Sequence, residues 1–148
     1  MCLHMRRIIC NHNEQKYATV CIGKQNWMAQ NLNYNAPGSI TYDNNPANGP
    51  IYGRLYDLKT IMQGANSSNT NPSRVRGICP KGWHVPSKAE FETLFEAVGF
   101  NTAGGALKAK VLWDAPNAGA TNNSGFTGLP GGSAGDITTP GSSLNSGK

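Results

Sequence analysis

Cys79 and His84 come nearest, in residue type and spacing, to a pair that could catalyse a reaction. A cysteine thiolate activated by an imidazole is a strong nucleophile, and a short Pro-Gly loop separates the two residues. A histidine that follows a tryptophan and precedes a helix start, however, more often hydrogen-bonds a loop carbonyl. The acidic residues show no paired arrangement typical of glycosidases, and Glu92 and Glu96 are expected on a solvated helix face. The sequence therefore predicts no catalytic residue and no enzyme.

The amino-terminal cysteines and histidines could bind a metal instead. Cys2-x-His4 and Cys10-x-His12 repeat one pattern, but a single-residue gap strains the tetrahedral geometry that zinc prefers. We therefore predict no metal and no cofactor, and interpret residues 1–15 as a disordered lead-in without a recognisable signal peptide. No spacing rule pairs Cys21 with Cys79, so each is predicted to be a buried free thiol.

A polar turn is the best candidate for ligand binding. Tyr42, Asp43, Asn44 and Asn45 lie in a loop bounded by prolines, and carboxylate and amide groups can bind sugar hydroxyls or contribute to a calcium site. The alternative, which we favour, is a turn in which these side chains cap their own backbone. No Glu-Pro-Asn or Gln-Pro-Asp triplet like that of calcium-dependent lectins is present. Tyr34 and Tyr42 are expected to be exposed, whereas Trp27, Trp83 and Trp113 are expected to pack in the core.

The helix start at Ser87 is the best-specified element of the chain. Pro86 fixes an extended approach, and Ser87 with Glu90 forms a capping box. Apolar residues then recur with helical spacing up to Val98, and Gly99 ends the helix. The remaining elements follow from β-forming residues and chain breakers. They are two strands in 17–27 with a turn at Gly23-Lys24, an ordered loop at 35–50, a first helix at 52–63, an exposed loop at 64–73, and a short helix or strand at 106–113.

Several blocks in one order then carry a family resemblance. Residues 20–34, 51–56 and 77–91 come first, followed by 106–109 with Trp113 and by 125–132. Together they resemble the Fibrobacter succinogenes major paralogous domain over residues 16–132. The Trp-His-Val-Pro-Ser-x-x-Glu-Phe block is also similar, more distantly, to the helix start of formylglycine-generating-type domains, which have a C-type-lectin-like fold. Their copper-binding cysteine pair has no counterpart in this chain.

The resemblance implies an α+β, C-type-lectin-like domain with two helices packed on a small, loop-rich antiparallel sheet. It also implies an extracellular or cell-surface location and a non-catalytic recognition or adhesion role, with a glycan or a protein as ligand. The alternatives are a structural repeat of a larger surface protein and a truncated copy without activity. Seven residues are predicted to be structural: Trp27, Tyr52, Arg54, Trp83, Pro86, Ser87 and Glu90. Arg54 is expected to be a buried charge that anchors loops through a carboxylate or carbonyls.

The composition changes near the carboxyl end. Residues 133–148 contain no aromatic residue and lack the β-branched density of closing strands. We interpret them as a flexible Gly/Ser/Thr-rich tail, with the terminal strands missing through truncation or a shifted frame after Gly132.

The net charge of +5 in 148 residues does not by itself indicate an anionic partner. The basic residues are scattered along the sequence, and no run of five to eight marks a nucleic-acid site. No apolar run is long enough to cross a membrane. We therefore expect neither a nucleic-acid partner nor a membrane-spanning segment.

Overall fold

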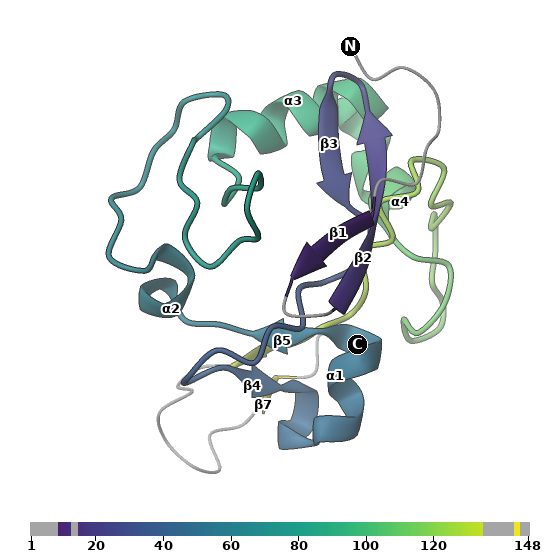
Figure 1. Cartoon of the computed structure of the whole chain (residues 1–148). Helices are drawn as coiled ribbons and strands as arrows, with labels where there is room; N and C mark the ends of the chain where they lie inside the picture. The colour runs from purple at the N-terminus through teal and green to yellow at the C-terminus, as the bar shows by residue number, and fades with distance from the viewer. Residues whose placement is uncertain (1–8, 13–14, 135–143, 146–148) are drawn as a thin grey trace.

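Four strands come first in the computed structural model, and the helices follow; the structure describes residues 9–12, 15–134 and 144–145 (Figure 1). The strands form three small antiparallel sheets, ordered β1-β2-β3, β4-β5 and β6-β7. The chain is therefore an α+β protein, as predicted, although four helices in the described residues replace the expected two. The strands are β1 (Ile9–His12), β2 (Gln15–Ile22), β3 (Gln25–Met28), β4 (Ile40–Thr41), β5 (Arg54–Leu55), β6 (Ser133–Ala134) and β7 (Leu144–Asn145). The helices are α1 (Gly49–Tyr52), α2 (Leu58–Met62), α3 (Lys88–Val98) and α4 (Ala103–Leu107), with single 3-10 turns at Tyr42–Asn44, Pro46–Asn48 and Phe100–Thr102.

The β2-β3 hairpin confirms the two predicted strands and their turn. Gly23 takes a left-handed φ of 59° in the turn, which glycine adopts without steric cost. The register pairs Val20 with Trp27 and Ile22 with Gln25. On the other side of β2, strand β1 pairs with residues 15–18. This strand falls within the span 1–15 that the sequence analysis interprets as a lead-in.

Helix α3 packs against this hairpin and forms the centre of the core. Leu94 is fully buried and clusters with Ile22 and Trp27. The Trp27 ring lies 5.2 Å from the Phe91 ring and 5.8 Å from the Phe126 ring, measured between centroids. Burying a leucine of this kind stabilises a fold by roughly 2–5 kcal/mol relative to alanine. The helix therefore owes its position to one apolar stripe that the sequence periodicity predicts.

The predicted first helix over 52–63 is wrong. Helix α1 ends at Tyr52, and helix α2 begins only at Leu58, after strand β5. Gly53, between them, has φ 75° and ψ −153°, and a Cβ there would lie 2.6 Å from the Asn31 Cβ. The apolar spacing is misleading because Leu58 is 72% exposed. A close backbone approach between distant segments therefore overrides the local helical pattern.

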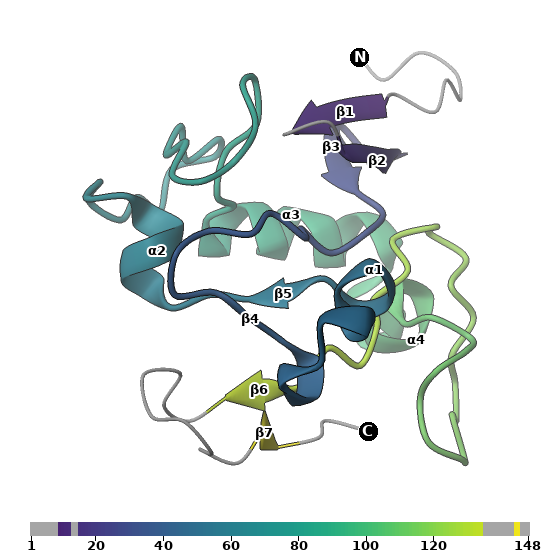
Figure 2. The ribbon, with the colours of Figure 1, turned by 60° about the horizontal axis from the view of Figure 1, so that its bottom comes forward.

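The segment between α2 and α3 has no helix or strand, yet backbone hydrogen bonds order it. The Ile78 amide donates to Ile61 O at 3.0 Å, and the Val85 amide donates to Val75 O at 2.7 Å. Residues 64–72 are mostly exposed, as predicted for this loop, whereas Ser73 is buried. In Figure 2 this teal segment projects beyond the helices that flank it. The chain thus presents a long, irregular but ordered segment at one side.

Past α4 the chain makes another irregular stretch. Helix α4 ends at Leu107, and Lys108 then forms an isolated parallel bridge with Gly128. The predicted element over 106–113 is therefore the end of a helix followed by a bridge. The indole Nε1 of Trp113 donates to Gly128 O at 2.9 Å. The short β6-β7 pair falls within the span predicted as a tail.

The cysteines depart from the prediction in one case. Cys21 is exposed and disulfide-bonded, so the expectation of a buried free thiol is wrong for this residue. Successive side chains of a strand point to opposite faces, and the burial of neighbouring Ile22 places Cys21 on the outer face. Cys79 is a half-buried thiol. The side chains of Cys2, His4, Cys10 and His12, on which the metal interpretation rests, lie outside the described residues.

Candidate functional site

The polar turn at Tyr42–Asn44 is built mainly by contacts within itself. Tyr42 is only 8% exposed, and its ring lies 5.1 Å from that of Tyr52. The expectation of an exposed Tyr42 is therefore wrong, because the residue packs on helix α1. Asn45 Oδ1 accepts the Ala47 amide at 3.0 Å, and Asn48 Nδ2 donates to Tyr42 O at 2.9 Å. These contacts are those of the alternative interpretation, in which the turn caps its own backbone.

Asp43 and Asn44 are the exposed members of this turn. Both have a left-handed backbone, with φ of 61° and 51°, which aspartate and asparagine tolerate better than most residues. In the part of the chain that the structure describes, no group of three or more His, Cys, Asp or Glu side chains could hold a metal ion. The role of Tyr42, Asp43, Asn44 and Asn45 in ligand binding stays a prediction.

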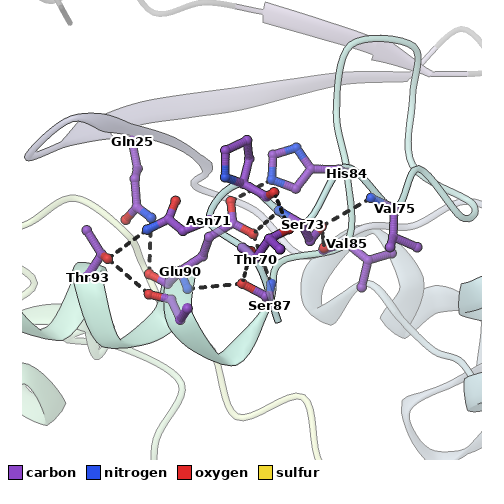
Figure 3. Close-up of polar contacts among 12 residues, drawn as sticks. Gln25, Thr70, Asn71, Ser73, Val75, His84, Val85, Ser87, Glu90 and Thr93 are labelled. Atoms are coloured by element: carbon purple, nitrogen blue, oxygen red, sulfur yellow. Dashed lines mark hydrogen bonds and ion pairs between the residues drawn. The ribbon is translucent and has the colours of Figure 1, made fainter. Parts of the chain in front are cut away.

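Glu90, at the start of α3, is the centre of a second polar cluster (Figure 3). Its Oε2 accepts the Ser87 amide at 3.0 Å, and its own amide donates to Ser87 Oγ at 3.2 Å, which completes the predicted capping box. Its carboxylate also bonds two residues of the preceding loop. Oε2 accepts the Ser73 amide at 3.0 Å, and Oε1 lies 2.6 Å from His84 Nε2. One buried carboxylate thus holds a helix start and a loop together.

The protonation of this cluster follows from its hydrogen bonds. Burial raises the pKa of the Glu90 carboxyl, but the bonds from Ser87, His84 and Ser73 outweigh burial, and the net pKa lies below its ordinary value. Glu90 is therefore a carboxylate at neutral pH. Because a carboxylate can only accept hydrogen bonds, the proton between Glu90 and His84 must be on His84 Nε2. A catalytic pair with Cys79 would have to use the other ring nitrogen, Nδ1. His84 thus bonds a carboxylate rather than the expected loop carbonyl.

Further hydrogen bonds near Glu90 also connect the loop to helix α3. Ser87 Oγ donates to Thr70 O at 2.8 Å, and Asn71 Nδ2 donates to Thr93 Oγ1 at 2.9 Å. Ser73 Oγ donates to Val85 O at 2.5 Å. The first two bonds join the middle of the loop to the N-cap and the second turn of α3, and the third closes the loop on itself, as Figure 3 shows. The capping pattern in the sequence predicts the roles of Ser87 and Glu90. No local pattern in the sequence indicates their partners in the loop.

Arg54 bonds the loop at Ser39 through one main-chain carbonyl, an acceptor of the expected kind, and one hydroxyl, but it is half-buried rather than buried. Nε donates to Ser39 Oγ at 2.8 Å, and Nη2 donates to Ser39 O at 3.1 Å. Nearby, the Tyr56 hydroxyl donates to Tyr34 O at 2.8 Å, and burial, followed by the charge of Tyr17, raises the pKa of this phenol. These half-buried, hydrogen-bonded side chains join segments of the fold that are distant in sequence.

The other residues that were predicted to be structural differ in how far they are buried. Trp27 is buried in the core, in agreement with its predicted role. Trp83, Trp113, Tyr52 and Pro86 are only half-buried. Trp83 therefore has one part of its indole on the surface of the loop that Glu90 holds.

A shallow groove runs along β2, and the sequence analysis misses it. Two adjoining hollows of about 550 and 420 Å³ share Lys16, Tyr17 and Gln30 in their lining. Most of the polar groups here are already engaged. Gln30 Oε1 accepts the Ala18 amide at 2.7 Å, and Tyr17 OH donates to Gln15 Oε1 at 2.5 Å.

Comparison with known families assigns the chain to one of them. The family model described as the Fibrobacter succinogenes major domain matches residues 20–146, and the chain belongs to this family. The match reaches further toward the carboxyl end than the motif blocks over 16–132. No match was found among the curated proteins or among the solved structures. Among the described residues, none of the helices has the length and apolar character needed to cross a membrane.

Proposed function

We propose that this domain is a non-catalytic recognition module for glycans, and that its binding surface is the segment 63–87 between α2 and α3. The observation that carries the proposal is the attachment of this segment to the buried Glu90 carboxylate through Ser73, His84 and Ser87. We further expect a C-type-lectin-like fold and an extracellular or cell-surface location, in keeping with the family resemblance.

The length of the segment supports this proposal. Irregular connections longer than about 12–15 residues are uncommon in compact domains, and ordered ones usually carry a function. A loop that is already ordered loses little conformational entropy when a ligand binds. The hydrogen bonds around Glu90 therefore prepare this surface for binding.

The chemistry of the segment suits carbohydrate. It presents exposed amide and hydroxyl side chains such as Asn66 and Ser67, together with the half-buried Trp83. Hydroxyls and amides can exchange hydrogen bonds with sugar hydroxyls, and an aromatic face can stack on a sugar ring.

A structural role within a larger surface protein is the second candidate. It is favoured by the number of family-motif residues whose contacts are internal, among them Trp27, Ser87 and Glu90. A domain of this kind would bind no glycan, whereas a recognition module would bind at least one.

A titration followed by amide NMR spectra separates these candidates. The 148-residue chain would be titrated with neutral and acidic oligosaccharides. We expect saturable shifts confined to residues 63–87. The absence of a saturable shift with every oligosaccharide, or shifts confined to the groove at Lys16 and Gln30, would overturn the proposal.

A further inference from the structure

The charge of this protein is concentrated in one part of the chain. No acidic residue lies between Asp57 and Glu90, and five basic residues do. The rest of the chain has eight basic and eight acidic residues, so this stretch holds the whole formal net charge of +5. The five basic residues are Lys59, Arg74, Arg76, Lys81 and Lys88.

Three of these cations are exposed on the surface and form no ion pair with another residue that the structure describes. Arg74, Arg76 and Lys81 are all exposed. The ion pairs of the described residues are His84 with Glu90 and the exposed pair of Lys88 with Glu92. The Glu90 carboxylate, which lies beneath the loop, is buried with both oxygens engaged. It forms no ion pair with any of the three cations.

The backbone around these cations is fixed. We call residues 74–85 the basic loop, whose neck is the bond from the Val85 amide to Val75 O. Within it, the Cys79 amide donates to Arg76 O and the Trp83 amide to Pro80 O, both at 3.0 Å. Arg74 has a left-handed φ of 60°, and its neighbour Val75 donates its amide to Ser73 Oγ at 3.2 Å. The loop therefore carries three cations and the half-exposed Trp83 on an ordered frame.

We propose that the basic loop binds an acidic polysaccharide, with uronic-acid carboxylates as its recognised groups. Arg74, Arg76 and Lys81 would pair with carboxylates spaced along the sugar chain, and Trp83 would stack on a sugar face. This inference rests on the proposed function and names its ligand class. Nucleic acid is disfavoured because its binding surfaces carry longer basic stripes that follow the phosphate backbone.

The strength of this interaction follows from the exposure of the cations. An exposed ion pair contributes up to about a factor of five in affinity, and salt screens it. The proposal therefore predicts a modest affinity that falls as the salt concentration rises. Binding of a neutral sugar would show no such dependence.

A matched pair of ligands and a matched pair of variants test the proposal. The ligands are an oligogalacturonate and its methyl ester, which differ in charge but share the sugar chain. The variants are Arg74→Gln with Lys81→Gln, and as a control Lys24→Gln with Lys110→Gln. Both control lysines are exposed, and Lys24 follows Gly23, whose turn contacts Ala97 in the second half of α3. The two double variants lose the same net charge from different places.

We expect the oligogalacturonate to shift the amides of the basic loop and the indole N–H of Trp83. The loop variant should bind it roughly tenfold more weakly, while the control stays within about twofold. Unchanged amide spectra of the unbound variants would verify that both fold. Raising the salt from about 50 to about 300 mM should weaken binding, and methyl esterification should nearly abolish it.

Three outcomes would overturn the inference. Equal losses in the two double variants would mean that net charge alone attracts the ligand. Equally tight binding of a single-stranded oligonucleotide would mean a surface without preference for sugar. The methyl ester or a neutral oligosaccharide could also bind saturably, with an affinity that neither double variant weakens. That result would overturn the inference and leave the proposed function intact. If no oligosaccharide binds, the proposed function fails as well.

Discussion

The Ser73 amide donates to Oε2 of Glu90 at 3.0 Å across 17 residues of chain. The same oxygen accepts the Ser87 amide at the helix N-cap. A capping box, which is ordinarily a local device at a helix start, therefore also fixes a distant loop. Helix α3 and the loop between α2 and α3 consequently share one stabilising group.

Replacing Glu90 by alanine should destabilise the domain more than replacing it by glutamine. Glu90→Ala leaves two buried amides and His84 Nε2 without their acceptor and should cost on the order of 3 kcal/mol or more. Glu90→Gln should cost about 1–2 kcal/mol, because its oxygen can still accept both amides and its NH₂ can donate to a neutral His84. Urea unfolding of the three proteins measures both values. Equal losses in the two variants would contradict this account, because the hydrogen bonds that glutamine retains would then contribute nothing.

The stability of the domain should fall in acid because of the same group. The folded-state pKa of Glu90 lies below its ordinary value of 4.5. The unfolded chain therefore takes up a proton first, and the stabilisation, complete above about pH 5.5, is lost as the pH falls through the folded-state pKa. Asp57 adds to this trend, since hydrogen bonds from Thr60 lower its pKa. Thermal unfolding between about pH 3 and 7 should show a shallower acid slope in Glu90→Gln than in the wild type.

Two glycines with left-handed backbones offer a test of the contact between the loop and α2. A Cβ on Gly77 would lie 2.1 Å from Ile61 O, whereas a Cβ on Gly64 would meet no atom within 4 Å. Gly64→Ala should therefore cost about 1–2 kcal/mol, the conformational penalty alone. Gly77→Ala should cost at least about 2 kcal/mol more, because the clash adds to that penalty. Chemical denaturation of both variants gives the difference, and similar values would contradict the close approach.

Ser87 should contribute more than an ordinary helix cap. Its hydroxyl accepts the Glu90 amide and donates to Thr70 O at 2.8 Å. Loss of a cap alone costs about 1 kcal/mol, and loss of the second bond should bring Ser87→Ala to about 2 kcal/mol. Ser87→Thr keeps the hydroxyl and is the matched control in the same unfolding experiment. A cost for Ser87→Ala that stays near the value for a cap would show that the Thr70 bond adds nothing.

Arg54 should resist replacement by lysine as well as by alanine. Its two bonds to Ser39 use two nitrogens of a planar group, and a lysine ammonium cannot reproduce that geometry. Both Arg54→Ala and Arg54→Lys should lower the melting temperature, by about 5 °C for a loss of roughly 1–2 kcal/mol. A lysine variant that melts like the wild type would mean that only the positive charge counts.

The sequence was informative where structure depends on neighbouring residues. The α3 capping box, its apolar stripe and the β2-β3 turn all arise within a few positions of one another, and each is predicted in place. The helix expected over 52–63 fails because Gly53 meets Asn31, 22 positions earlier, and no local pattern records that contact.

The candidate site was harder to predict for a similar reason. Arg74, Arg76 and Lys81 look scattered in the sequence, and only the neck at Val75 and Val85 assigns them to one loop. Composition and periodicity carry no information on a main-chain bond of this kind across an irregular loop.

The hydrogen bonds that hold the basic loop come largely from the main chain. The amides of Ser73, Val75 and Val85 could be supplied by almost any residue other than proline. Side chains at the tip, including Arg76 and Lys81, can therefore be exchanged without touching the bonds that close the neck. The loop is thus a natural place for grafting new binding sequences, and its specificity can be altered separately from the stability of the domain.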